Sequence, residues 1–241
     1  DAMKNASLPL PTIHATGYTN DNSQYFILMD HIPGESVREY MSEVDTDDNL
    51  HRVIGETFGK LHGITRNYQG WVSMEKPYDT SWGEAYFLAF HNRLEEIERH
   101  SYLPTNTITN LRTFVDTQKE TWVESTTFVL SHLDGFQGIA SKQGEEWSVD
   151  GIIDIEDHQF TDQRFVLCGH ELAMETEGKK LPESFWNGYS STKEIDPTFN
   201  QHKSLFKLYY LSVWLCVFRD ESIGDIPDRD EKADKTMRMI E

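Results

Sequence analysis

The spacing of the apolar residues changes repeatedly along this chain, and that change constrains the fold more than any other feature. Residues 12–32 contain two β-rich runs separated by a polar, turn-forming cluster, which is the pattern of a hairpin. From Asp48 the apolar residues recur every three or four positions, as in an amphipathic helix that ends near Gly63. Residues 126–156 return to short β-rich runs, with a hairpin turn at 143–146. We therefore expect an α+β fold, in which a helix-rich body carries a β insert.

The remaining segments are expected to be mostly helical. Apolar spacing predicts helices over residues 85–97 and 108–122. Residues 203–219 are apolar nearly all round, which predicts a buried helix, and the charged tail from Asp220 is expected to be frayed or exposed. Residues 70–82 are rich in Trp, Pro, Tyr and polar residues, so we expect a connecting loop that could carry a substrate lip.

Charge and cysteine content narrow the class of partner. Lys and Arg total 22 against 41 Asp and Glu, so the formal net charge of −19 repels nucleic-acid phosphates and anionic lipid. The same charge weakly favours a cationic ligand, although an acidic balance is also a common route to solubility. Cys168 and Cys216 form no CxxC pair, which favours a reducing cytoplasm. The longest apolar run, residues 208–218, is too short to cross a bilayer.

Two carboxylates follow β-rich runs of the insert. Asp134 lies in the sequence SHLDGFQGIAS with His132 and Gln137, and Asp154 ends the apolar run GIID. A carboxylate that emerges from a core is destabilising unless it is paired or metal-bound. Two such groups at one mouth suit phosphoryl transfer, where one accepts the proton of a substrate hydroxyl and another holds Mg²⁺ against the phosphates. Spacing alone slightly favours the simpler interpretation, that both carboxylates cap turns.

Four segments, in order, resemble motifs of the aminoglycoside phosphotransferase and choline kinase-like family, which shares the protein-kinase fold. LPLPTIHATGYTNDNSQYFILMDHIPGESV resembles its strand pair and hinge, and IGETFGKLHGI resembles its leucine-histidine helix. SHLDGFQGI resembles its catalytic loop, and GIIDIEDHQFTD resembles its metal-binding segment. The resemblance implies that residues 1–33 are a remnant of the N-terminal lobe and hinge. Residues 34–241 would then be the helical C-terminal lobe that carries catalysis and the substrate.

The resemblance assigns roles to individual residues. It implies that Asp134 is the base for the acceptor hydroxyl, that His132 shapes the same loop, and that Asp154 is the Mg²⁺ ligand. The family's second metal ligand, an asparagine five residues after the aspartate, is replaced here by Ile139, which has no side-chain oxygen. Gln137 offers an amide oxygen two residues earlier and is the substitute ligand that we consider.

The nucleotide site and two structural residues also follow from the resemblance. His62 and Asp162 match packing and turn positions, and we interpret both as structural. The family's hinge, whose carbonyl and amide groups hydrogen-bond an adenine or guanine edge, matches the backbone of Met29, Asp30, His31 and Ile32.

Two functions remain open at this stage. The first is a small-molecule phosphotransferase that transfers the γ-phosphate of ATP or GTP, with Mg²⁺, to a hydroxyl. Its acceptor would be an aminoglycoside, another antibiotic, a choline-like amine or a sugar. The second is a catalytically silent binding protein, since the family's phosphate-covering loop, lysine and partner glutamate precede the hairpin, at about which this chain begins. An uncovered hairpin edge would also predict a homodimer.

Other chemistry-bearing residues receive weaker interpretations. The acidic run at Glu95, Glu96 and Glu98 is expected to be a solvated helix face, although the resemblance also allows it to receive a cationic amino sugar. Aromatic residues near the central loop either line a pocket for a ring or cation or belong to the core: Trp71, Tyr78, Trp82 and Tyr86. Four histidines without metal-ligand spacing are expected at the surface or at caps: His91, His100, His170 and His202.

Overall fold

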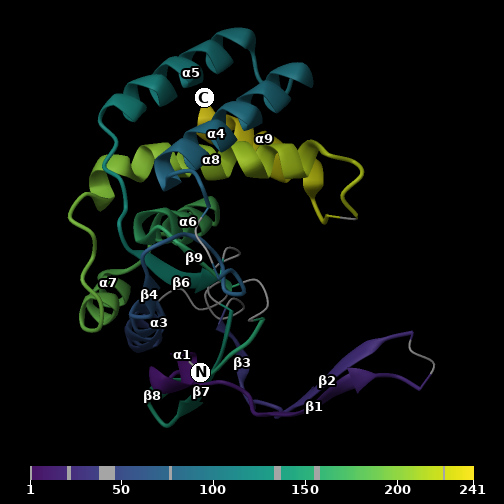
Figure 1. Ribbon diagram of the computed structural model, residues 1–241, viewed down its shortest axis with the longest axis vertical. Coiled ribbons are helices and arrows are strands. Elements are labelled where there is room, and N and C mark those ends of the chain that lie inside the picture. Colours follow the sequence, from purple (N-terminus) through teal and green to yellow (C-terminus); the bar gives the residue numbers. More distant parts are fainter. Residues whose placement is uncertain are drawn as a thin grey trace.

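The computed structural model describes residues 2–20, 23–37, 47–75, 78–132, 137–154, 158–224 and 226–241 (Figure 1). In chain order its elements are α1 (Ala2–Asn5), β1 (Ile13–Tyr18), β2 (Tyr25–Met29), β3 (Glu35–Ser36), α3 (Asp48–His62), β4 (Thr65–Arg66), β5 (Gly70–Trp71), α4 (Trp82–Arg99), α5 (Thr105–Glu120), β6 (Phe128–His132), β7 (Gly138–Gln143), β8 (Glu146–Ile152), β9 (His158–Thr161), α6 (Gln163–Thr176), α7 (Glu183–Ser190), α8 (Phe199–Arg219) and α9 (Arg229–Ile240). The antiparallel pairs β1–β2 and β7–β8 lie at both expected hairpins, which confirms the α+β plan.

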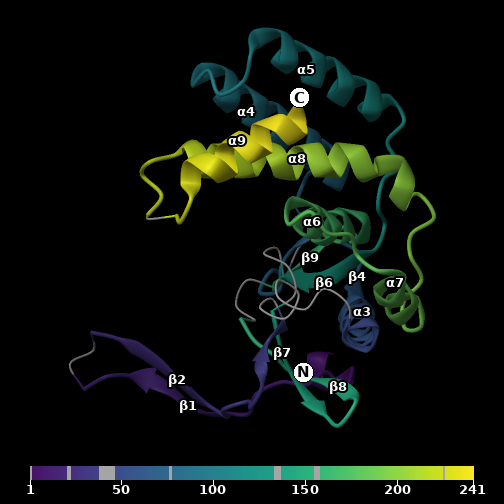
Figure 2. The same ribbon diagram turned by 180° about the vertical axis from the view of Figure 1, so that it is seen from behind.

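Helices and sheets follow one another in layers along the long axis (Figures 1 and 2). Helices α4, α5, α8 and α9 stack at one end, and α6 lies between them and a four-stranded sheet of order β4-β6-β9-β5. Helices α3 and α7 pack together beyond that sheet, and the three-stranded sheet β3-β7-β8 forms the other end. The β1–β2 hairpin projects sideways, away from all of these layers.

Helix α3 begins and packs as its sequence dictates. The side chain of Asp47 accepts hydrogen bonds from two amides of the first turn, which is the usual role of an N-cap aspartate. Helix α7 approaches so closely that a Cβ atom on Gly55 would lie 2.1 Å from the carbonyl oxygen of Phe185. On the facing helix, a Cβ atom on Gly188 would lie 2.0 Å from the carbonyl oxygen of Arg52. These two glycines therefore set the distance between the helices.

A buried ion pair fixes the start of α6. Asp162 and Arg164, with side chains each 1% exposed, are joined by an Nη2–Oδ2 contact of 2.6 Å. Arg164 also donates to the carbonyl of Val123 and to the hydroxyls of Ser125 and Thr198, each at 2.9 Å. Since Asp162 caps α6 as well, the structure agrees with the structural role expected for it.

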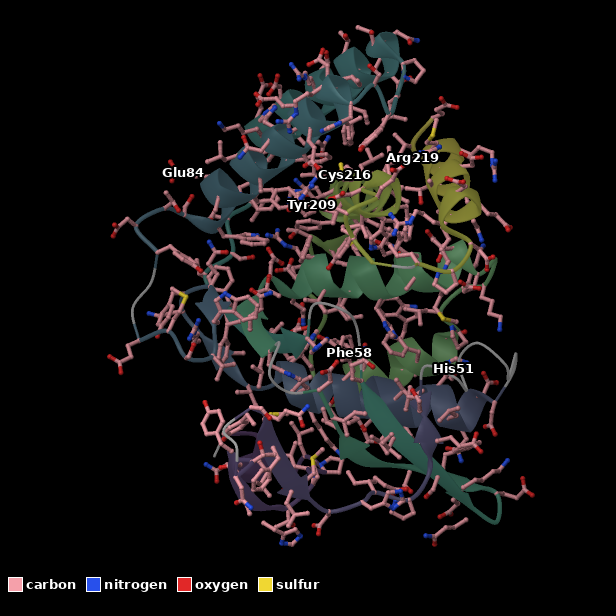
Figure 3. The ribbon with its side chains drawn as sticks, turned by 90° about the vertical axis from the view of Figure 1, so that its right-hand side faces the viewer. His51, Phe58, Glu84, Tyr209, Cys216 and Arg219 are labelled. Atoms are coloured by element: carbon pink, nitrogen blue, oxygen red, sulfur yellow. The ribbon has the colours of Figure 1, made fainter. Side chains whose placement is uncertain are left out.

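Aromatic side chains fill the space between the upper helices. Tyr86 is buried and stacks on Trp122 with ring centroids 5.7 Å apart, and its hydroxyl donates to the carbonyl of Leu205 at 3.1 Å. Figure 3 shows Tyr209 and Cys216 in the layer between α8 and α4. The ring of Tyr209 lies 5.4 Å from that of Phe90. Tyr86 therefore belongs to the core and not to a ligand pocket.

His62 and His170 are buried against the ring of Phe58, and a third buried histidine, His51, lies further along α3 (Figure 3). The exposed fractions of His51, His62 and His170 are 5%, 0% and 8%. His62 Nδ1 lies 2.8 Å from the hydroxyl of Tyr189, which agrees with its expected packing role. The surface position predicted for His170 is wrong, because the ring lies 5.4 Å from Phe58 in this core.

The C-terminal tail also differs from the expectation. The charged tail after Asp220 is not simply frayed, because it contains helix α9, whose Ala233 is buried against the body. Two ion pairs from Arg219 of α8 reach Asp230 and Asp234 of α9, at 3.6 and 2.7 Å. Burial of Ala233 and Ile240, supplemented by these exposed ion pairs, holds the tail against the body.

Two further side chains lie where spacing did not place them. Helix α5 ends at Glu120, so Trp122 lies beyond the helix predicted to contain it. His202, expected at the surface, is buried beside the ring of Trp122, with centroids 5.0 Å apart. Among the described residues, no helix is both long and apolar enough to cross a membrane.

Candidate functional site

The candidate site lies where strands β6, β8 and β9 meet. His132 is the last residue of β6 and pairs in register with His158, the first residue of β9. Strand β8 ends at Ile152, two residues before Asp154. Chain segments that are distant in sequence thus bring His132 and Asp154 to one edge of the sheets.

His132 and Asp154 lie in contact. The Nε2 atom of His132 is 3.6 Å from Oδ2 of Asp154, which is too long for a hydrogen bond and close enough for electrostatic attraction. The histidine side chain is 2% exposed, whereas the aspartate side chain is 46% exposed. The buried ring therefore holds one side of a carboxylate whose other side faces solvent.

Asp154 has an unusual backbone conformation. Its φ of 59° lies in the left-handed region, which aspartate tolerates better than most residues but which still strains the chain. The bend at Asp154 follows the end of β8 at Ile152, and the carboxylate of Asp154 is 46% exposed. Strain of this kind, at a half-exposed carboxylate beside a buried histidine, is typical of a functional position.

Gln137 lies beside this bend. Its carbonyl accepts a hydrogen bond of 3.0 Å from the amide of Ile153, next to Asp154 in the chain. Ile139, by contrast, lies within β7, paired with Ser36 and Gly151. The structure therefore brings His132 close to Asp154 and the backbone of Gln137 close to Ile153, whereas Ile139 occupies a strand position. Asp134, the expected base, lies outside the described residues.

The expected hinge follows β2. Met29 ends the strand, and Asp30 and Thr12 bond to each other: the amide of Asp30 donates to the carbonyl of Thr12 at 2.9 Å. The amide of Asp30 is thus already used and does not serve a nucleotide. Within the described part of the chain, the amides of His31 and Ile32 have no hydrogen-bond partner.

Local bonds also occupy the Asp30 side chain. It accepts from the amide of Thr12 at 3.1 Å and lies 2.6 Å from Nε2 of His14, and these bonds lower its pKa. Ile32 is positioned differently, because a Cβ atom on Gly151 would lie 2.1 Å from its Cδ1 atom. The end of the hinge therefore packs on β8, three residues before Asp154.

A loop at the edge of the same sheet is held by an arginine that the sequence analysis missed. Arg66 donates to the carbonyls of Tyr68 at 2.9 Å, Gly70 at 2.7 Å, Trp71 at 3.1 Å and Met74 at 3.3 Å. Its guanidinium carbon also lies 4.0 Å from the centre of the Tyr68 ring. The described start of the expected loop is thus held by hydrogen bonds from Arg66 to carbonyls as far as Met74. No residue pattern in the sequence signals these contacts, because the partners of Arg66 are backbone carbonyls.

The four aromatic residues weighed near this loop divide into two groups. Trp71 is 43% exposed and Tyr78 is 48% exposed, whereas Tyr86 is buried and Trp82 is half-buried against the core. Of these four residues, Trp71 and Tyr78 are therefore the two whose rings are accessible to a ligand. Among the acidic residues, Glu96 pairs with Arg93 at 2.6 Å on a partly solvated helix face.

The described residues of the site offer few ligands for a magnesium ion. Mg²⁺ takes oxygen ligands, commonly one or two carboxylates completed by water and phosphate oxygens. Asp154 offers one accessible carboxylate, and within the described ranges no group of three or more His, Cys, Asp or Glu side chains could hold a metal. A bound ion would be held by Asp154 and by phosphate oxygens, and it would neutralise phosphate charge.

Comparison with known proteins supports the class of kinase-like small-molecule phosphotransferases. Within that class, the sequence matches the fructosamine kinase family over residues 2–226. The chain belongs to this family. The expected resemblance to kinase-like phosphotransferases is thereby confirmed, whereas membership of the aminoglycoside phosphotransferase family is not shown.

Solved structures show the same fold. A protein of Haemophilus somnus described as a fructosamine-3-kinase is 15% identical with a TM-score of 0.53, and the match covers 100% of this chain and 77% of that one. The aminoglycoside phosphotransferase APH(4)-Ia, in a complex with AMP-PNP and hygromycin B, is 12% identical with a TM-score of 0.61, covering 98% and 77%. A choline/ethanolamine kinase family protein of Mesorhizobium loti is 15% identical with a TM-score of 0.58, covering 99% and 74%. No curated protein matches the chain.

Proposed function

We propose that this protein transfers the γ-phosphate of ATP or GTP to a hydroxyl of a small sugar-amine acceptor. The observation that carries the proposal is the meeting of His132 with the strained, half-exposed Asp154 at the ends of β6 and β8. Asp134 follows His132 by two residues in the chain and supplies the second carboxylate that phosphoryl transfer requires.

The proposed step needs two separate carboxylate roles. The acceptor hydroxyl oxygen forms a bond to the γ-phosphorus, the bond to the β-phosphate oxygen breaks, and the nucleoside diphosphate leaves. Asp134 orients the hydroxyl and takes its proton, and Asp154 would hold a Mg²⁺ ion, which would neutralise phosphate charge. His132 positions Asp154 from its buried side, and the oxygen of Gln137 replaces the amide oxygen that Ile139 lacks.

The nucleotide base is proposed to bind along the hinge. The amides of His31 and Ile32 have no partner in the described chain, so they offer the hydrogen bonds that a purine edge needs. The carbonyl of Met29 would complete this edge. Asp30 supplies no hydrogen bond to the base, because its amide is bound to Thr12 and its carboxylate to Thr12 and His14.

The acceptor is proposed to be a ketoamine of a sugar, the chemistry that the family name describes. Such an acceptor carries both hydroxyls and a protonated amine, and the net charge of −19 favours the cation. An aminoglycoside shares these groups and is the second acceptor to test, since the similar structure of APH(4)-Ia holds hygromycin B.

Transfer of radioactive phosphate from γ-labelled ATP or GTP to a fructose–lysine adduct, with Mg²⁺, tests the proposal. Asp134→Asn is expected to abolish turnover while nucleotide affinity stays nearly unchanged, and Asp154→Asn is expected to weaken Mg²⁺-dependent nucleotide binding. Asp116→Asn, at a side chain 66% exposed on α5, is the matched control. Full turnover of the Asp134 variant would remove the base from the mechanism.

A catalytically silent binding protein is the second candidate, and Ile139 is the residue that favours it. Ile139 packs within β7, where its Cγ2 atom would lie 2.9 Å from a Cβ atom on Gly34. The silent alternative predicts that neither the native chain nor Ile139→Asn gains melting temperature from Mg²⁺ and nucleotide. A clear rise in the native chain would contradict it.

A further inference from the structure

A pair of histidines lies at the end of the four-stranded sheet that is next to the candidate site. His132, the last residue of β6, and His158, the first residue of β9, are in register, so both side chains lie on the same face of the sheet. Their ring centroids are 5.3 Å apart at an interplanar angle of 66°, an edge-to-face arrangement that aromatic rings favour. The exposed fractions of the two residues are 2% and 3%, so the rings pack together away from solvent.

This histidine pair contrasts with the neighbouring pair on the same face of the sheet. Two residues earlier on β6, Leu130 pairs in register with Phe160 of β9, and both of these side chains are apolar. Burial of an imidazole is less favourable than burial of leucine or phenylalanine, because its nitrogen atoms are polar. The histidine pair nevertheless lies at the strand ends, where Nε2 of His132 is 3.6 Å from Oδ2 of Asp154. The residue type on this face therefore changes from apolar to imidazole where the candidate site begins.

The backbone of His158 is held from both sides, unlike that of Asp154. On one side β9 pairs with β6, and on the other the amide of Val72 donates to the carbonyl of His158 at 3.4 Å. Because cross-strand neighbours on one face pack against each other, the His158 ring restricts rotation of the His132 ring. Asp154 follows the end of β8 with its side chain 46% exposed, so contact with a fixed His132 ring limits the orientations of its carboxylate.

We propose that His158 is a positioning residue that holds the His132 ring against Asp154 and thereby keeps the Asp154 carboxylate in place for Mg²⁺. This inference rests on the proposed function, which assigns the metal to Asp154. In this role His158 acts through His132 and not by contact with the acceptor or the nucleotide. Residues that orient a metal ligand from outside typically change metal affinity or activity by about 10- to 100-fold when they are removed.

Binding of AMP-PNP to the full chain, titrated with Mg²⁺, tests the effect of His158 on the metal. His158→Ala opens space beside His132 and is expected to raise the Mg²⁺ concentration for half-maximal binding roughly tenfold. His158→Phe keeps an aromatic ring of similar size and is expected to retain most of the native Mg²⁺ dependence. His158→Leu, which fills the space without a planar ring, gives the same test as His158→Ala if that variant does not fold.

A second buried histidine provides the matched control for this titration. His202 of α8 is 0% exposed, and its ring centroid lies 5.0 Å from that of Trp122. His202→Ala is expected to lower the melting temperature and to leave the Mg²⁺ dependence unchanged. An equal change of Mg²⁺ dependence in the His158 and His202 variants would reduce His158 to a structural residue and overturn the proposal.

Nuclear magnetic resonance follows the contact between His132 and Asp154 without metal, nucleotide or turnover. In protein that carries isotope-labelled histidine, the ring-proton signal of His132 reports the charge beside the ring. Asp154→Asn removes that charge and is expected to shift the His132 signal in the native chain and in His158→Phe. In His158→Ala the shift is expected to be lost, because the His132 ring no longer stays at Asp154. A shift of the same size in His158→Ala as in the native chain would overturn the proposal.

Together with an assay of phosphate transfer, these measurements distinguish failure of the positioning role from failure of the proposed function. Mg²⁺ dependence and a His132 signal that both change in His158→Ala, in a chain without phosphate transfer, support the positioning role and overturn the function. Phosphate transfer with a Mg²⁺ dependence that His158→Ala leaves unchanged overturns the positioning role and supports the function. The absence of both effects in a chain without phosphate transfer overturns both.

Discussion

Two five-residue strands, β2 with the sequence YFILM and β6 with the sequence FVLSH, have similar apolar character and opposite environments. Every residue of β2 is exposed and every residue of β6 is buried. Strand β6 lies inside the four-stranded sheet, next to α3 and α6, whereas β2 pairs only with β1 and leaves the body (Figures 1 and 2). Local sequence therefore explains strand formation in both, and the neighbouring layers decide burial.

The largest loss of stability is expected in the buried region, at the ion pair between Asp162 and Arg164, directly after β9. Arg164→Ala leaves Asp162 as an unpaired buried charge, so the free energy of unfolding is expected to fall by about 3–5 kcal/mol in urea denaturation. Arg112→Ala breaks a more exposed pair with Glu98 and is expected to cost less than about 1 kcal/mol. Equal losses from the two variants would contradict the contrast between buried and exposed regions.

The same substitution in the two strands sharpens the comparison. Leu130 in β6 is 4% exposed and Leu28 in β2 is 57% exposed. Leu130→Ala is expected to lower the free energy of unfolding by about 2–5 kcal/mol, because it opens a cavity in the core. Leu28→Ala is expected to change it by less than about 0.5 kcal/mol. Comparable losses would mean that the hairpin is covered in solution.

Sequence patterns predicted most of the fold because periodicity depends on local residues. The hairpins and α3 follow directly from spacing and turn residues, and the Asp47 cap starts α3 as its chemistry requires. The α9 helix was missed because its charged sequence reads as solvated, whereas Ala233 and Ile240 are buried against the body and Arg219 pairs with two of its aspartates. Burial of His170 depends on helices that are distant in sequence, which no local pattern reports.

The candidate site was predictable in its residue types and not in its geometry. Motif order singled out His132 and Asp154, but their contact depends on the register between β6 and β9 and on the left-handed bend. The role of Arg66 could not be predicted, because its partners are backbone carbonyls, which carry no residue signature. Exposure likewise separated Trp71 from Tyr86 only once the packing was known.

A third prediction concerns the buried histidines, which titrate differently in the folded and unfolded chain. Burial lowers the pKa of His62 to about 3 and that of His170 to about 4, from an ordinary value of 6.5. The unfolded chain therefore binds more protons between these values, and stability falls as pH drops from about 6.5 toward 4. Each histidine is expected to contribute up to about 1.4 kcal/mol per pH unit.

Urea denaturation at several pH values, with His170→Phe, checks this prediction. The variant keeps an aromatic ring beside Phe58 and removes one proton-binding group, so its stability is expected to decline less steeply below pH 6.5 than that of the native chain. His91→Gln is the control, since His91 is a partly exposed residue paired with Asp116. An unchanged slope in the His170 variant would show that its ring is already charged in the folded chain.

The smallest effect is expected from the hairpin, where exposure offers a surface to a second copy of the chain. Residues 13–29 contain one acidic residue, Asp21, and no lysine or arginine. Charge repulsion between two copies of the protein is therefore expected to be weakest at this hairpin. Its strand edges and apolar side chains predict a weak homodimer, measurable by sedimentation equilibrium at increasing concentration. Ile27→Lys is expected to abolish association while changing monomer stability by less than about 0.5 kcal/mol. Leu88→Lys on α4 is expected to leave association intact, and a monomer at every concentration would contradict the prediction, because exposed β2 would then be stable alone.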